Sequence, residues 1–260
     1  WYNRGRYSLT LLAIALAVAF IVSTLLLTFS ISNVGEPLTA AYDDVDVVVS
    51  GPEVAEASGP AGATIAPVDP ETLGALSNAG FEVVGLSDPY AQVLTAAGDP
   101  AGQDVASANI AVPWLGDSPL NAYSLGAGEA PVDVTSMLLD TTTAERAGLN
   151  IGDTVTVVTG LGANEFTLTG LAEFGGQGNA PYQSTVMLSP DNAVFDIVDG
   201  VPGAGYARLL IAGADVDAVS ALIDPSLIVQ TGTEWAKEQA NDLNAFLGFF
   251  EIFLVVFAVV

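Results

Sequence analysis

The sequence contains no cysteine and no histidine, and these two absences remove several kinds of chemistry. Without cysteine there is no disulfide and no thiol nucleophile. Without histidine there is no imidazole base, and the commonest zinc ligand is missing. Hydrolytic triads built around histidine are therefore excluded. Any catalysis would have to use Asp, Glu, Ser, Thr or Tyr side chains.

Positive charge is also scarce. The 260 residues include 5 Lys and Arg against 30 Asp and Glu, which gives a net charge of -25. Such a chain repels the phosphates of nucleic acids, so we expect no nucleic-acid partner. The single lysine, Lys237, follows no glycine-rich loop, so the chain lacks a P-loop for nucleotide phosphates. The stretch that begins with Asp215, Val216 and Asp217 is faintly similar to a calcium loop, but it lacks the glycine at the sixth position. Its acidic residues are interpreted as acids at a helix N-terminus. No cofactor and no metal ion are predicted on this chain.

Long apolar runs stand at the two ends. Residues 7–31 carry no charge and exceed the roughly 20 residues that cross a bilayer, so they are predicted to form a transmembrane helix. A secretory signal peptide is the alternative, but its apolar region is shorter. Arg4 and Arg6 precede the run and acidic residues follow it, which places residues 1–6 in the cytoplasm.

The apolar run at the C-terminal end is shorter. Residues 247–260 are apolar apart from Glu251 and are predicted to be the start of a second transmembrane helix. Glu251 is interpreted as a carboxylate near the outer membrane interface, with a polar contact between the two membrane helices as the alternative.

Residues 32–241 are predicted to form an extracytoplasmic domain of the α+β class. Asp69 can cap a helix whose first residue is Pro70 and which stops at Gly80. The pattern predicts strands on either side of this helix. The expected strands are residues 44–51, 81–86, 90–96 and 106–111.

The second part of this domain is predicted to be rich in β-structure. Thr142 and Glu145 could form a capping box, and Gly148 would end that helix. The alternation after Gly152 predicts a hairpin that reaches Phe174, with residues 160–164 as its loop. Residues 206–230 then predict a strand, a helix from residue 215 to 223, and a second strand. These elements are suited to joining the first sheet.

A helix is predicted from Thr233. Its apolar side chains Leu243, Phe246, Leu247 and Phe250 have the i, i+3, i+4, i+7 spacing of one helix face. Residues 233–246 would be a stalk that couples the domain to the second membrane helix. The alternative is an amphipathic helix that only docks on its own domain.

Three segments in this order resemble a known family. They are the first apolar run with DVDVVVSG after it, the segment AERAGLNIGDTVTVV with its hairpin FTLTGLAEF, and EWAKEQANDLNAFLGFFEIFLVVFAVV. Together they resemble the first membrane helix, the outer domain and the second membrane helix of FtsX-like and MacB-like ABC transporter permeases. The resemblance implies a porter-like βαβ subdomain, residues 43–115 and 205–232, interrupted by a smaller β-rich subdomain, residues 116–204.

The resemblance also implies a function. Such a chain would be a non-catalytic permease subunit in the cell membrane, moved by a separate cytoplasmic ABC ATPase that binds ATP and magnesium. Its other partners would be membrane lipid and a second permease copy or repeat. The sequence does not choose among export, extraction of lipoproteins or lipids, and control of cell-wall hydrolases. A membrane-tethered ligand-binding or sensor protein is one alternative. A surface-anchored hydrolase, which would need a carboxylate pair in a cleft, is another.

Overall fold

The computed structural model describes residues 18, 35–55, 64–101, 108–198, 201–202 and 205–259. The chain divides into two compact units, one of Glu36–Lys237 and one of Trp1–Gly35 with Glu238–Val260. The predicted cytoplasmic residues 1–6, and the predicted membrane helix 7–31 apart from Val18, lie outside the described residues.

In the described part of the chain, no helix combines the length and the hydropathy that crossing a membrane requires.

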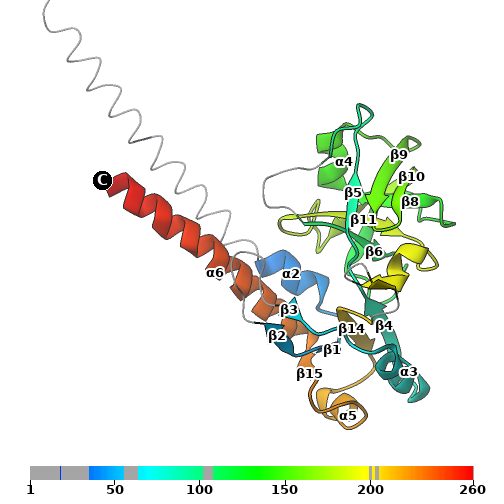
Figure 1. Cartoon of the computed structure of the whole chain (residues 1–260), viewed down its shortest axis with the longest axis vertical. Helices are drawn as coiled ribbons and strands as arrows, with labels where there is room; N and C mark the ends of the chain where they lie inside the picture. The colour runs from blue at the N-terminus through cyan, green and yellow to red at the C-terminus, as the bar shows by residue number, and fades with distance from the viewer. Residues whose placement is uncertain are drawn as a thin grey trace, which may run out of the picture. The chain divides into compact units, whose positions relative to one another are not determined.

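The larger unit contains a four-stranded antiparallel sheet. Its strands, in spatial order, are β15 (Ile228–Thr231), β1 (Val47–Ser50), β14 (Arg208–Ala212) and β4 (Glu82–Leu86). One face, which includes Val47 and Ile211, packs against helices α3 (Pro70–Asn78) and α5 (Val216–Ser220) through Leu76 and Val219 (Figure 1). The sheet is therefore built from two stretches of sequence that meet only after folding.

Between those stretches the chain forms a seven-stranded sheet. Its main path runs through β5 (Ala91–Val93), β9 (Thr154–Thr159), β10 (Gly162–Phe174), β8 (Ser136–Asp140), β11 (Gln183–Leu188) and β6 (Ala108–Pro113), and β7 (Tyr123–Gly128) pairs with β10. The pairs β10–β8 and β11–β6 are parallel, and the others are antiparallel.

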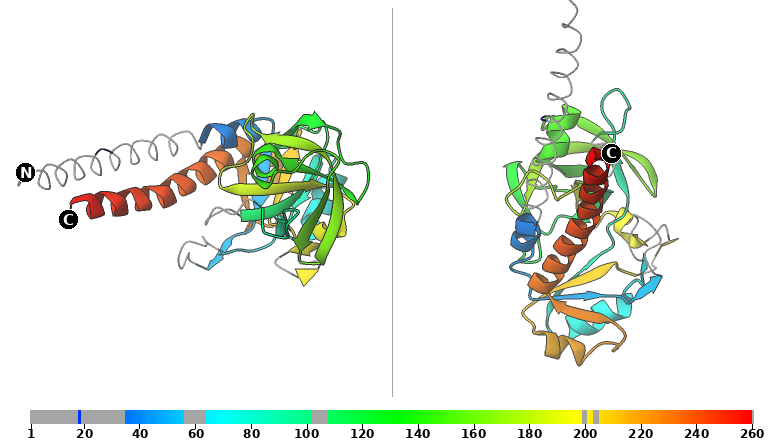
Figure 2. Two further views of the ribbon diagram at one scale, coloured as in Figure 1. Left: turned by 90° about the horizontal axis from the view of Figure 1, so that it is seen from above. Right: turned by 90° about the vertical axis from the view of Figure 1, so that its left-hand side faces the viewer.

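The two outer strands of this path meet, so the sheet curls into a barrel (Figure 2). Tyr90 and Ile110 form an isolated bridge, and the Ala111 amide donates to the Pro89 carbonyl at 2.8 Å. Inward side chains such as Met137 and Leu168 fill the interior. Helix α4 (Thr141–Ala147) and the 3-10 helix η1 (Ala193–Asp196) contribute Ala144 and Val194 to the same core.

A third cluster of buried side chains joins the two sheets. It contains Val48 and Leu210 from the four-stranded sheet and Leu138 and Met187 from the barrel. Burial of apolar side chains shared by both sheets makes their separation costly, because each would expose its inner face to water. The larger unit is therefore two subdomains with a common core.

The remaining described elements are short, apart from the last helix. Helix α2 (Gly35–Ala41) precedes β1, and two small hairpins pair β2 (Glu53–Ala55) with β3 (Thr64–Ile65) and β12 (Ile197–Val198) with β13 (Val201–Pro202). Helix α6 (Gly232–Val259) ends the described chain. In the smaller unit, Ala240 of α6 is buried, and a Cβ added to Gly35 would lie 3.6 Å from it.

The helix ends agree with the sequence in one case and differ in another. Asp69 caps α3 by accepting the Glu71 amide at 2.7 Å, with Pro70 as the first helical residue, as predicted. The predicted capping box of Thr142 and Glu145 is wrong. Asp140 caps α4 instead, accepting the Thr143 amide at 2.7 Å, because α4 starts one residue before Thr142.

The strand assignments also differ from expectation. Strands β5 and β6 fall within the range 43–115 assigned to the porter-like subdomain, but they pair in the barrel sheet. The first stretch of the four-stranded sheet therefore ends at Leu86. The hairpin loop between β9 and β10 is shorter than the predicted 160–164, because β10 already begins at Gly162.

Candidate functional site

Helix α6 starts at a well-defined cap. The Thr231 amide and hydroxyl donate to Glu234 Oε2 at 3.1 and 2.9 Å, and the Glu234 amide donates to the Thr231 hydroxyl at 3.2 Å. This reciprocal pattern is a capping box, which fixes the first turn of a helix. At Gly232 a Cβ would lie 2.1 Å from the Val45 carbonyl oxygen, so only glycine allows this close approach.

Aromatic rings continue from this helix start into the barrel. The Trp235 ring lies 4.7 Å from that of Tyr42, which lies 6.3 Å from Phe174, which lies 5.2 Å from Tyr123. Tyr42 follows α2, and Phe174 ends β10. Edge-to-face and tilted contacts of this kind contribute about 0.5–1.5 kcal/mol each beyond area burial. The first turn of α6 is thus connected through side chains to the far subdomain.

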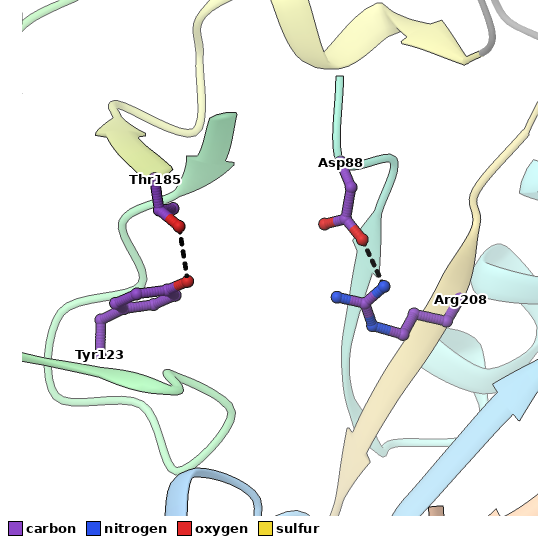
Figure 3. Close-up of polar contacts among 4 residues, drawn as sticks. All are labelled: Asp88, Tyr123, Thr185 and Arg208. Atoms are coloured by element: carbon purple, nitrogen blue, oxygen red, sulfur yellow. Dashed lines mark hydrogen bonds and ion pairs between the residues drawn. The ribbon is translucent and has the colours of Figure 1, made fainter. Parts of the chain in front are cut away.

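An ion pair closes the neck, by which we mean the two places where the chain passes between the subdomains, residues 87–90 and 205–208. Arg208 Nη1 donates to Asp88 Oδ2 across 120 residues of sequence (Figure 3). The side chains are 16% and 20% exposed. The Arg208 guanidinium carbon also lies 5.1 Å from the centroid of the Trp235 ring, within cation–π range. Arg208 therefore touches both the outgoing crossing and helix α6.

Electrostatics keep this arginine charged. Burial alone lowers the pKa of a guanidinium, but the neighbouring Asp88 carboxylate and Tyr42 hydroxyl together raise it by more, so the pKa of Arg208 is raised overall. Burial also raises the pKa of Tyr42, against the opposing effect of Arg208. Arg208 is consequently a cation and Tyr42 a neutral phenol throughout the physiological range.

One polar atom of each side chain in the ion pair has no hydrogen-bond partner. Within the described residues, Asp88 Oδ1 and Arg208 Nε are buried and have no hydrogen-bond partner. Asp88 also has a φ of 45°, in the left-handed region that Asp tolerates better than most side chains. A pair with a single hydrogen bond is weaker than a bidentate pair, in which both atoms would be satisfied. The ion pair that joins the two crossings of the neck is therefore mostly buried, but it does not satisfy all of its hydrogen-bonding atoms.

Buried polar groups support the barrel side of the neck. The Tyr123 hydroxyl donates to Thr185 Oγ1 at 3.1 Å (Figure 3), and burial raises the pKa of Tyr123. Asp140 is fully buried and accepts the Thr143 and Thr185 amides, each at 2.7 Å. Burial raises the pKa of Asp140, and these two hydrogen bonds oppose the rise. One carboxylate thus caps α4 and ties it to β11.

At the neck, Arg208 pairs with Asp88 and lies over the ring of Trp235, which in turn contacts Tyr42. In the part of the chain that the structure describes, no three His, Cys, Asp or Glu side chains are grouped so that they could hold a metal ion. The arrangement can connect the start of α6 with both subdomains.

The predicted site residues lie elsewhere. Arg4 and Arg6 fall outside the described residues. Leu243 is a half-buried residue of α6. Phe246, Leu247 and Phe250 belong to the α6 backbone, but their side chains are outside the description. The prediction that this stripe couples the domain to the membrane stays a prediction.

Sequence reasoning missed the residues of the neck. Arg208 and Asp88 are 120 positions apart, so no local pattern connects them. One signal was available. Arg208 is one of only 5 basic residues, and it begins the strand Arg208–Ala212, whose other side chains are all apolar. A charge at the start of such a strand calls for a buried partner.

The family model for the MacB-like periplasmic core domain matches residues 7–226. The chain therefore belongs to this family, which confirms the resemblance to MacB-like permeases. A comparison with curated proteins gave no match. The family belongs to ABC transporter permeases, which are membrane transport components, generally non-catalytic, that carry an extracytoplasmic domain and normally work with a cytoplasmic ABC ATPase.

Proposed function

We propose that this chain is the permease subunit that couples ATP hydrolysis by a separate cytoplasmic ABC ATPase to movement of its extracytoplasmic domain. The family match over residues 7–226 is the observation that carries the proposal. In this proposal residues 7–31 cross the cell membrane, residues 247–260 begin a second crossing, and a second permease copy or repeat completes the complex. ATP and magnesium bind to the partner.

The contacts at the start of α6 support a mechanical role. The capping box fixes the first turn, Trp235 reaches Tyr42, and Arg208 joins Trp235 to Asp88. A displacement of this first turn cannot stay local, because its side chains are packed in the core that both subdomains share. The output would be export or extraction of a substrate, or a signal to the cell envelope, as in FtsX-like permeases.

Copurification tests the proposal. The full-length protein, tagged and extracted from its own membranes in mild detergent, should bring with it an ABC ATPase that mass spectrometry identifies and whose ATP turnover is measurable. A tagged membrane protein of another family is the control. Absence of an ATPase from several gentle preparations would contradict the proposal and favour the membrane-tethered sensor.

Topology can be tested in the same strain. The protein has no cysteine of its own, so a single cysteine at Arg146 can be labelled selectively. A membrane-impermeant maleimide should label it in intact cells, and a cysteine at Arg4 only after lysis. Labelling in the opposite order would refute the predicted orientation.

A further inference from the structure

A groove of about 440 Å³ lies at one end of the barrel. Its walls come from the hairpin β9–β10, from the turn before β8, and from the turn before η1. Phe166 and Val194 form an apolar floor, being 6% and 1% exposed. The two turns are joined by a hydrogen bond from Asn192 Nδ2 to the Val134 carbonyl at 3.2 Å. The groove is therefore shaped by connected elements.

One wall of the groove is an open strand edge. From Gly162 to Phe166, strand β10 pairs with β9 on one side. Pairing with β8 on the other side begins only at Thr167, opposite Ser136. Among the described residues no strand pairs with that second side of residues 162–166. Backbone groups along an open edge can accept an added strand, so a peptide placed in line with β8 would continue the sheet.

Aliphatic side chains are exposed around this edge. Leu161, in the two-residue turn of the hairpin, is 54% exposed, Val134 is 47% exposed, and Val132 is 82% exposed. Hairpin turns are usually occupied by Gly, Asn, Asp or Ser, so a leucine there needs another reason. Leu161 and Val134 both line the groove. They would be covered by an apolar side chain of an occupant.

The groove is also negatively charged. Glu165 and Asp191 line it, and none of its lining residues is basic. In the described chain neither carboxylate takes part in a hydrogen bond or ion pair. The domain as a whole is strongly acidic, so an acidic occupant would be repelled. Charge complementarity selects an occupant with Lys or Arg side chains.

We propose that this groove binds an extended segment of another protein in which aliphatic residues alternate with Lys or Arg. The segment adds to the open edge of β10. Its aliphatic residues contact Leu161 and Val134, and its cationic residues pair with Glu165 and Asp191. The interaction does not depend on ATP coupling, so either proposal can fail alone.

A designed peptide tests the surface on the full chain in detergent. The probe is a fluorescein-labelled octapeptide of alternating valine and lysine, measured by fluorescence anisotropy at about 150 mM NaCl, where long-range attraction is largely screened. We expect saturable binding, and slower hydrogen exchange at the amides of residues 162–166. Leu161→Ser and Glu165→Lys should each weaken binding by at least about tenfold, as expected for contacts at the centre of a small interface. Leu222→Ser, at a 48% exposed leucine beside α5, is the matched control and should change nothing.

Four results of the peptide experiments would overturn the proposal. They are no binding to the unmodified chain, equal binding of an octapeptide with glutamate in place of lysine, unchanged binding by both groove variants, and protection outside residues 162–166. A dimer of the chain that Leu161→Ser dissociates in sedimentation would assign the groove to a second copy, which also refutes a cationic occupant. Melting temperatures within about 2 °C of the unmodified chain show that each variant is folded, since a surface change normally costs under about 0.5 kcal/mol.

Discussion

Replacing Arg208 with methionine should destabilise the domain far more than removing the whole ion pair. The substitution keeps a long apolar side chain beside Trp235 but leaves the Asp88 carboxylate, only 20% exposed, without its cation. Loss of one partner of a fully buried pair costs about 3–5 kcal/mol, and the residual exposure reduces this. Loss of the cation–π contact adds about 1 kcal/mol. We expect a total near 3 kcal/mol.

The double variant separates the pair from its surroundings. Asp88→Asn keeps the side-chain shape and tolerates the positive φ. Combined with Arg208→Met it removes both charges, so no unpaired charge remains buried. The double variant should therefore be more stable than Arg208→Met alone, with a coupling energy of at least about 1.5 kcal/mol between the two sites.

Thermal unfolding of the purified full chain, followed by near-UV circular dichroism of its aromatic residues, measures these differences. A loss of about 3 kcal/mol should lower Tm by about 6–12 °C in a domain of this size. Leu222→Ser, at a 48% exposed leucine beside α5, is the surface control and should shift Tm by less than about 2 °C. If the effects of Arg208→Met and Asp88→Asn simply add, the pair does not act as a unit and this account of the neck is wrong.

Three further predictions concern single elements. In Asp140 the carboxylate accepts hydrogen bonds from two buried amides, whereas Asp140→Asn keeps only one acceptor oxygen. The substitution should therefore destabilise the chain by about 1–3 kcal/mol in thermal unfolding. An unchanged Tm would contradict this role of Asp140. Hydrogen bonds from the Thr231 hydroxyl and amide lower the pKa of Glu234 below its ordinary value of 4.5. The stability that the capping box contributes is therefore present above pH 4.5 and is lost as the pH falls through the folded-state pKa. Glu234→Gln should therefore lower Tm at neutral pH, with the difference shrinking in acid, and a constant difference would refute the linkage. Inserting four glycines after Ala240 of α6 should leave the domain folded and the partner's ATPase active, because each glycine costs only about 1 kcal/mol in a helix. The insertion should still abolish transport or signalling, because it makes α6 flexible. Wild-type activity of the variant would reject the proposal that α6 transmits movement.

Local signals in the sequence predicted several elements correctly. The cap at Asp69 followed by Pro70, and the alternating pattern of β9 and β10, depend only on neighbouring residues. Signals of this kind act over a few positions and do not need the rest of the fold. The same reasoning chose the wrong capping box. The pattern of a threonine followed three residues later by glutamate occurs at Thr142 and again at Thr231, and only the second forms, because α4 already has Asp140 as its cap.

Other elements have no local signal. Strand β8 reads SMLLD and is buried on both faces, so it lacks the alternation by which a half-exposed strand is recognised. The assignment of β5 and β6 to the barrel depends on pairing partners far away in the sequence. The contact between Arg208 and Asp88 exists only when both sheets have formed. These features arise from tertiary structure, so composition and periodicity could not reveal them.

The position of the neck bears on how this domain could be exchanged between relatives. The chain leaves the four-stranded sheet after Leu86 and returns at Arg208, and the ion pair holds these two crossings next to each other. An insertion whose ends lie together can be replaced as a cassette without moving its host. A bare excision would fail, because Val48 and Leu210 would lose the barrel residues that cover them. A working graft therefore has to bring its own counterparts of the barrel residues in this shared core, among them Phe174, which contacts Tyr42.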